Sequence, residues 1–249
     1  MTTPRPRGVT VVTGASGGNG AAIAVRLAAS GRDVVVADVV PADATVAAVE
    51  AAGRRGWVWT GDLGDAGAVE RFVAEVAERS GCCDVLVNNA AHQQTALLAE
   101  LDLATWRRVQ AVNVEAAFLL CQALVPGMVA AREGRVVNVV SNTVWSPPGP
   151  GFLAYISSKG ALLGLTRALA VELAGTGVTV NAVAPGLTRT ASAVAGLPPE
   201  AHAAVLERQA VKRPLEAEDQ AAAVAFLVSA DASAITGQSL RVDGGVVPL

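Results

Sequence analysis

Tyrosine and lysine are almost absent from this chain of 249 residues. Tyr155 is the single tyrosine, and Lys159 and Lys212 are the two lysines. Aromatic residues make up 4% of the sequence and charged residues 16%, so the core has to be built mainly from alanine, valine and leucine. That composition favours a buried parallel sheet flanked by alanine-rich helices.

Several other absences narrow the class of protein. The formal net charge is −3 and the arginines are scattered, which argues against a nucleic-acid-binding surface. The richest apolar run, 116–125, is too short to cross a membrane. The three cysteines, two of them adjacent, form no disulfide framework, and no His/Cys spacing indicates a metal site. Together with an N-terminus that lacks the features of a signal peptide, these absences predict a soluble, cytoplasmic protein.

Short valine-rich runs alternate with longer alanine-rich segments of helical period along the whole sequence. The pattern predicts strands at 9–13, 33–38, 56–60, 84–89, 135–141, 178–185 and 239–245, and helices at about 19–30, 42–52, 66–80, 103–131, 153–174 and 217–229. Such alternation is typical of an α/β fold, a doubly wound parallel sheet of seven strands with helices on both faces. Because no linker interrupts the pattern, residues 1–249 are predicted to form one domain.

Residues 186–216 break this rhythm. The segment contains proline, alanine and arginine and is weakly patterned. It follows a strand at the edge of the sheet where ligands bind in such folds, so it is predicted to be a mobile substrate lid.

A glycine-rich turn follows the first predicted strand and opens the first helix. Gly14, Gly18 and Gly20 would bring backbone amides to a helix N-terminus, which suits a pyrophosphate. Asp38 ends the second strand, where a carboxylate accepts hydrogen bonds from ribose hydroxyls and repels a 2′-phosphate. No basic residue immediately follows it, so the sequence favours NAD over NADP as the cofactor.

Tyr155 and Lys159 are four positions apart, which places their side chains on one face of a helix, a turn apart. A phenol beside an ammonium indicates acid–base chemistry. Taken alone, the pair is equally compatible with a packing tyrosine and a surface lysine.

The motifs taken together resemble those of the short-chain dehydrogenase/reductase family over essentially the whole chain. The matching segments are "TGASGGNG" (13–20), "GDLGD" (61–65), "NNAA" (88–91), "AVNVEAAF" (111–118), "VNVVS" with "AYISSK" (137–159), "APGLTRT" (184–190) and "ITGQSLRVDGG" (235–245). The resemblance implies a catalytic set of Asn113, Ser141, Tyr155 and Lys159. It implies cofactor contacts at Gly14, Ser16, Gly18, Asn19, Gly20, Asp38, Asp62, Leu63, Asn89, Ala90, Tyr155, Lys159, Pro185, Leu187 and Thr190.

The family reaction explains why the tyrosine and the lysine occur together. Hydride transfer between a carbinol carbon and nicotinamide requires a proton to move to or from the oxygen, and Tyr155 would be the acid/base. The Lys159 ammonium and the positive nicotinamide ring would lower the pKa of the phenol from its usual value of about 10. Ser141 would hold the substrate oxygen, and Asn113 is implied to hold a water that continues the proton path.

Three departures from the family pattern stand out. The loop between Ser141 and Tyr155 is one residue longer than the commonest spacing, and a Pro/Gly-rich stretch can absorb the insertion. Asn19 replaces an aliphatic residue, and Ala91 replaces a glycine beside the cofactor.

The substrate is less well defined by the sequence. The candidate pocket residues are Thr143, Trp145, Phe152 and His92, and they favour a hydrophobic or aryl-alkyl secondary alcohol or its ketone. Several stretches are similar to the branch of the family that includes 1-phenylethanol dehydrogenases. The alternatives are a 3-oxoacyl or sugar-type carbonyl reductase, with Arg189 and Arg213 as possible anion ligands, and a cofactor-binding sensor without turnover. The resemblance also implies a homotetramer with helices 103–131 and 153–174 at one interface.

Overall fold

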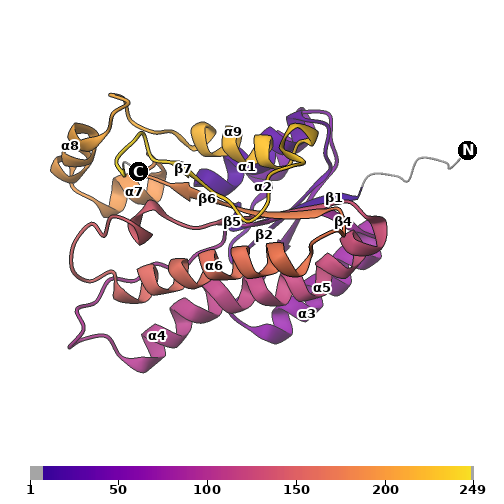
Figure 1. Ribbon diagram of the computed structural model, residues 1–249, viewed down its shortest axis with the longest axis horizontal. Helices are drawn as coiled ribbons and strands as arrows, with labels where there is room; N and C mark the ends of the chain where they lie inside the picture. Colours follow the sequence, from indigo (N-terminus) through magenta and orange to yellow (C-terminus); the bar gives the residue numbers. More distant parts are fainter. Residues whose placement is uncertain (1–7, 248–249) are drawn as a thin grey trace, which may run out of the picture.

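Seven parallel strands form one sheet in the computed structural model, which describes residues 8–247 (Figure 1). The strands are β1 (Val9–Thr13), β2 (Val34–Asp38), β3 (Gly56–Thr60), β4 (Cys83–Asn88), β5 (Gly134–Val139), β6 (Val178–Pro185) and β7 (Ser239–Val242). Their order is β3-β2-β1-β4-β5-β6-β7. The predicted doubly wound α/β fold is confirmed, and each predicted strand is present. Of the N-terminal stretch 1–14 considered for a signal peptide, residues 1–7 lie outside the described residues and 9–13 form β1.

Helices cover both faces of the sheet (Figure 1). One face carries α1 (Gly18–Ala29), α2 (Asp43–Ala51) and α9 (Ala217–Leu227), and α1 packs on α9. The other carries α3 (Ala66–Ser80), α4 (Leu103–Gln110), α5 (Ala116–Ala131) and α6 (Leu153–Glu172). The lid region adds α7 (Ala191–Gly196) and α8 (Pro199–Arg208).

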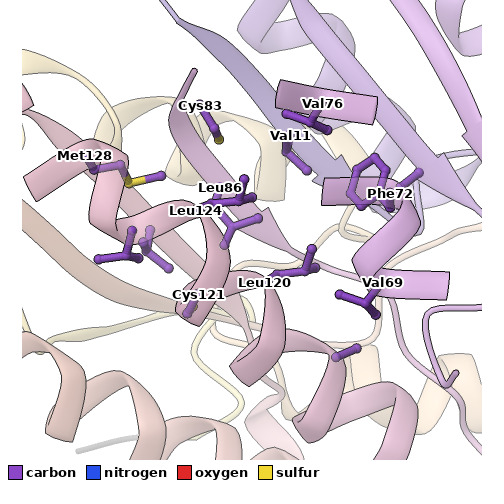
Figure 2. Packing of buried hydrophobic residues seen from close by; sticks show 14 of the residues in the cluster. Val11, Val69, Phe72, Val76, Cys83, Leu86, Leu120, Cys121, Leu124 and Met128 are labelled. Atoms are coloured by element: carbon purple, nitrogen blue, oxygen red, sulfur yellow. The ribbon is translucent and has the colours of Figure 1, made fainter. Parts of the chain in front are cut away.

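Figure 2 shows the core between the sheet and the α3–α5 layer. Phe72 of α3 and Leu120 of α5 are almost completely buried and pack in one cluster with Val11 and Leu86 of the central strands. Small and branched side chains of this kind fill a parallel sheet that is covered on both faces. The sheet is therefore held rigidly, and the carboxyl ends of its strands form a fixed edge on which a site can be built.

The predicted helix 103–131 is continuous, but it contains a π-helical turn at Ala111–Glu115. By length and composition alone this helix could cross a membrane, which corrects the expectation drawn from the run 116–125. Core helices pass the same test, and α5 packs against α3, β4 and β5 as a layer of the fold. The π turn places Asn113 in the core, with 1% of its surface exposed.

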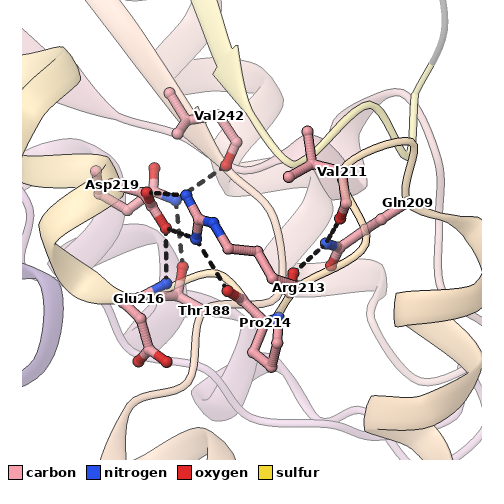
Figure 3. Close-up of polar contacts among 9 residues, drawn as sticks. Thr188, Gln209, Val211, Arg213, Pro214, Glu216, Asp219 and Val242 are labelled. Carbon is pink, nitrogen blue, oxygen red and sulfur yellow. Dashed lines mark hydrogen bonds and ion pairs between the residues drawn. The ribbon is translucent and has the colours of Figure 1, made fainter.

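The lid region differs from the prediction of a weakly patterned segment, because 186–216 contains α7 and α8. Proline at the first turn of α8 fits a helix start, since its missing N–H needs no partner there. The two segments that flank these helices, 186–190 and 209–216, are joined by a β-bridge between Thr188 and Leu215, and we call them the stem. The stem is tied to the body of the protein (Figure 3). Gln220 of α9 donates hydrogen bonds to the Thr188 hydroxyl (3.4 Å) and to the Val242 carbonyl (2.9 Å).

Candidate active site

The glycine loop between β1 and α1 is packed so closely that Gly14 and Gly20 have no room for a side chain. A Cβ on Gly20 would lie 2.1 Å from the Gly14 carbonyl oxygen, and one on Gly14 would lie 2.6 Å from Ala90 Cα. Gly14 and Gly18 have positive φ values of 64° and 54°. No side chain caps the N-terminus of α1, so its first amides point outward without a side-chain partner. This loop is a suitable cradle for a pyrophosphate.

The glycine loop is held in place by the residues that directly follow β4, the strand next to β1 in the sheet. The Asn89 side-chain amide donates to the carbonyls of Thr13 and Gly14, both at 2.8 Å. The Thr13 hydroxyl accepts the amides of Asn89 and Ala90, both at 3.0 Å. Asn89, predicted as a cofactor contact, therefore uses its side chain to brace the loop, and Thr13 is a partner that the sequence did not reveal.

A cleft of about 310 Å³ lies beside the loop, at the carboxyl ends of β1, β2 and β4. The cleft is lined by six of the predicted cofactor contacts, Gly14, Asp38, Asp62, Leu63, Asn89 and Ala90. The other lining residues are Ala37, Val39, Gly61, Ala91, His92, Arg108 and Val112. Asp38 accepts hydrogen bonds from the amides of Ser16 (2.8 Å) and Val39 (2.7 Å), which aim its carboxylate at the loop. The cleft has the composition expected for an adenosine half-site.

His92 lies in this cleft, beside Asp62, although it was predicted to line the substrate pocket. Its amide donates to the Asn113 side-chain oxygen at 2.7 Å, and its carbonyl accepts from the same side chain at 3.1 Å. The segment after β4 is thus fixed along the cofactor cleft.

Tyr155 and Lys159 lie a turn apart on α6, and the Lys159 Nζ is 5.7 Å from the centroid of the Tyr155 ring. The Lys159 side chain is 1% exposed, and its Nζ donates to the Val139 carbonyl at 2.7 Å. Burial lowers the pKa of this lysine to about 8. The predicted pair is therefore brought together in the interior, at the end of β5.

Burial and a hydrogen bond act in opposite directions on the pKa of Tyr155. Burial is the largest influence and raises it above its usual value, even though the residue as a whole is half-buried, while a hydrogen bond with Ser141 lowers it. The Lys159 ammonium donates its hydrogen bond to the Val139 carbonyl. The chain's own groups thus keep the phenol protonated at neutral pH, the form that acts as an acid.

The hydrogen bonds of the Asn113 side chain brace α6 and do not involve Lys159. Its amide nitrogen donates to the Ser158 hydroxyl at 2.9 Å, and that hydroxyl donates to the Tyr155 carbonyl at 2.7 Å. Both amide hydrogens of the side chain are used by Ser158 and His92, and its oxygen accepts one hydrogen bond, from the His92 amide. Ser158 is a supporting residue that sequence reasoning missed.

The predicted substrate residues occupy different surroundings. The Thr143 hydroxyl donates to Ser141 Oγ at 2.9 Å and so adjoins a residue of the predicted catalytic set. Trp145 packs against the cluster containing Val140 and Leu162, with the Arg241 guanidinium 5.5 Å from its ring. Its contacts are those of a packing residue. Phe152 precedes α6 as its N-terminal flanking residue and is half-buried.

The stem contacts the glycine loop between β1 and α1 at Thr190. A Cβ on Gly18 would be 3.2 Å from the Thr190 methyl group, which places Thr190 beside the loop as predicted for a cofactor contact. Pro185 and Leu187 belong to the same passage from β6 into the stem.

The two lid arginines considered as anion ligands are both paired with acids. Arg189 contacts Glu216 at 2.6 Å, and Arg213 contacts Asp219 at 2.6 Å, the latter drawn in Figure 3. Their charges are balanced within the stem, which favours their alternative interpretation as surface arginines.

Comparison with known proteins identifies the class. The family model described as Enoyl-(Acyl carrier protein) reductase matches residues 14–247. Cis-4-hydroxycyclohexanecarboxylate dehydrogenase of Sinomonas cyclohexanicum is 41% identical over 95% of both chains. Meso-2,3-butanediol dehydrogenase of Serratia marcescens is 36% identical over 95% of this chain and 93% of its own.

A solved structure assigned as a short-chain alcohol dehydrogenase of Sinorhizobium meliloti 1021 superposes with a TM-score of 0.91, at 35% identity and 97% coverage of each chain. Another, assigned as an NAD(P)-dependent gluconate 5-dehydrogenase of Beutenbergia cavernae and containing NADP, has a TM-score of 0.89 at 37% identity, covering 96% of each chain. The chain belongs to the short-chain dehydrogenase/reductase family and is an oxidoreductase of alcohol- and ketone-type substrates that uses a nicotinamide cofactor.

Proposed function

We propose that the protein is an NAD-dependent dehydrogenase that interconverts a hydrophobic secondary alcohol, including aryl-alkyl and alicyclic carbinols, and its ketone. The observation that carries the proposal is the convergence of Ser141, Tyr155 and Lys159 at the end of β5, in a protein whose separate cleft is lined by Asp38 and the glycine loop.

The chain's own groups fit a nicotinamide dinucleotide, because Gly14 and Gly20 leave a cradle that any Cβ would fill. The bound nicotinamide would supply the hydride acceptor or donor. In the reductive direction, Ser141 would hold the ketone oxygen and Tyr155 would give it a proton from its hydroxyl. In the oxidative direction Tyr155 would first have to lose its own proton, and the resulting phenolate would take the proton of the alcohol; the Lys159 ammonium and the positive ring of an oxidised cofactor would favour that phenolate and so offset the effect of burial.

One observation from the structure argues against an anion site at the lid arginines, and the names of two relatives support a ring-bearing substrate. Arg189 and Arg213 are neutralised by Glu216 and Asp219, so neither lid arginine is free for a phosphate-bearing or acidic carbonyl compound. The name of the 41% identical relative describes a hydroxyl group on a six-membered carbon ring. A 37% identical relative from Thauera aromatica is a (2S)-[(R)-hydroxy(phenyl)methyl]succinyl-CoA dehydrogenase subunit, whose name places the hydroxyl next to a phenyl ring.

The testing experiment is NADH consumption by the purified protein with acetophenone, 4-oxocyclohexanecarboxylate, diacetyl and a 3-oxoacyl thioester. Fastest turnover of acetophenone supports the proposal, and fastest turnover of the thioester favours the 3-oxoacyl alternative instead. NADH binding with no turnover of any ketone would favour a sensor.

Asp38 is expected to determine the preference for NAD over NADP. Replacing Asp38 with asparagine keeps an oxygen that can accept the Ser16 amide but removes the charge that repels a 2′-phosphate. The ratio of kcat/KM values for NADH over NADPH should fall by about 10-fold or more. The same change at Asp43, an exposed residue in the first turn of α2, is the control and should leave the ratio unchanged. An unaltered ratio in Asp38→Asn would contradict the assignment of NAD.

The proposal includes a homotetramer in the cytoplasm. The helices predicted to form an interface carry large apolar side chains on their outer surfaces, among them Leu103, Phe118 and Val171. Burial of such a surface against another copy of the chain would remove it from water.

A further inference from the structure

The adenosine end of the cleft is crossed by an ion pair. Arg108 of α4 donates from Nη1 to one Asp62 carboxylate oxygen at 2.8 Å and from Nη2 to the other at 3.0 Å. Asp62 belongs to the loop between β3 and α3, so the pair joins two walls of the cleft, and both residues line it. A bidentate pair of this kind fixes orientation as well as charge.

The surrounding backbone is adapted to this pair. The Gly64 amide donates to Asp62 Oδ1 at 2.9 Å, which fixes the carboxylate from below. A Cβ on Gly64 would lie 2.3 Å from Arg108 Nη1, so the position of the guanidinium depends on a glycine there. Both side chains remain accessible, with 39% of Arg108 and 45% of Asp62 exposed. The pair is therefore open to the cleft rather than sealed beneath it.

We propose that Arg108 is a positioning residue for the cofactor: it holds the Asp62 carboxylate in the orientation that receives the adenine end of the dinucleotide. This inference rests on the proposed binding of a nicotinamide dinucleotide in the cleft. Each carboxylate oxygen has more than one lone pair, so Asp62 keeps acceptor capacity while Arg108 holds it. Arg108 acts at the end of the cofactor opposite to the reacting carbon, so it should affect binding and leave the chemical step unchanged.

The experiment compares Arg108→Ala with Arg107→Ala, a neighbouring exposed arginine on the same helix. NADH is used, or NADPH if the cofactor preference proves reversed. Arg108→Ala should raise Kd and KM for the dinucleotide by about 10-fold with kcat within about 2-fold, and Arg107→Ala should change neither. Arg108→Lys should recover part of the affinity, because a lysine is a point charge that cannot hold both oxygens at once.

Two further measurements separate positioning from general structural damage. Reduced nicotinamide mononucleotide lacks the adenosine half, so its turnover should be the same in the wild type and in Arg108→Ala. In an Asp62→Asn background, Arg108→Ala should have little additional effect on dinucleotide affinity, because both changes break one unit. Equal loss of activity with the mononucleotide, additive effects with Asp62→Asn, or unchanged dinucleotide affinity would each overturn the proposal. A wild-type protein that binds the dinucleotide but reduces none of the ketones would contradict the proposed substrate class and leave the role of Arg108 testable by binding.

Discussion

Replacing Tyr155 with phenylalanine is expected to lower kcat/KM for ketone reduction by about 100- to 10,000-fold, the usual contribution of a positioned acid or base. Phenylalanine keeps the ring and removes the hydroxyl that meets Ser141. The ring itself packs at the start of α6, so its retention should preserve the fold around Lys159. The affinity for NADH should change little, because the glycine loop and Asp38 lie on other elements.

The measurement is steady-state reduction of the best ketone of the panel, with NADH binding followed by fluorescence. Phe226→Leu is a suitable companion variant, since it changes an exposed aromatic side chain of α9 that lies outside the candidate site. Turnover that survives in Tyr155→Phe would show that another group moves the proton. Loss of NADH binding in that variant would instead point to misfolding of the site.

Replacing Gly20 with alanine is expected to weaken dinucleotide binding by about 100-fold and to lower the free energy of unfolding by about 1–3 kcal/mol, as overpacking of a filled site does. The added Cβ would lie 2.1 Å from the Gly14 carbonyl and 2.6 Å from the Asn89 side-chain nitrogen. Backbone cannot rotate away as a flexible side chain can, so the loop has to move off α1. That movement would misplace the amides proposed to bind the pyrophosphate.

Gly17→Ala is the matched control in the same loop. Gly17 has an extended backbone with φ −168°, and a Cβ there meets no atom of the chain within 4 Å. Titration of both variants with NADH and urea unfolding should show the loss in Gly20→Ala alone. Equal affinities in the two variants would mean that the close approach at Gly20 is relieved without consequence for the cofactor.

Regular elements were predictable because their patterns are local. Strands β1, β3 and β6 begin and end as expected, and α3 begins and ends at the predicted residues 66 and 80. The π turn around Asn113 was not predictable, because Asn113 forms its hydrogen bonds with distant residues: His92 and Ser158 are 21 and 45 residues away in sequence. Helix α8 could have been found from the prolines at 198 and 199, which begin a segment of helical period.

The site shows the same division. Residue types and their spacing pointed to Tyr155 and Lys159, which the fold brings together on one helix. The ion pair between Arg108 and Asp62 joins residues 46 positions apart and left no local signal. That Lys159 and a positive nicotinamide ring together lower the pKa of Tyr155 stays a prediction, and spacing alone revealed neither the burial of the phenol nor the carbonyl to which the Lys159 ammonium donates.

The buried lysine couples the stability of the protein to proton concentration. Its pKa falls from 10.5 to about 8 on folding, so between these pH values the unfolded chain holds a proton that the folded chain has released. The free energy of unfolding should therefore decrease as the pH falls from 10.5 to 8, by a total on the order of 3 kcal/mol, and lose nothing further from this group below pH 8. Urea unfolding of the cofactor-free protein across this range should show the slope, and Lys159→Met should remove it. At neutral pH the protein thus keeps the ammonium proposed to act in catalysis at the expense of thermodynamic stability, and replacing the lysine is expected to give a more stable but inactive protein.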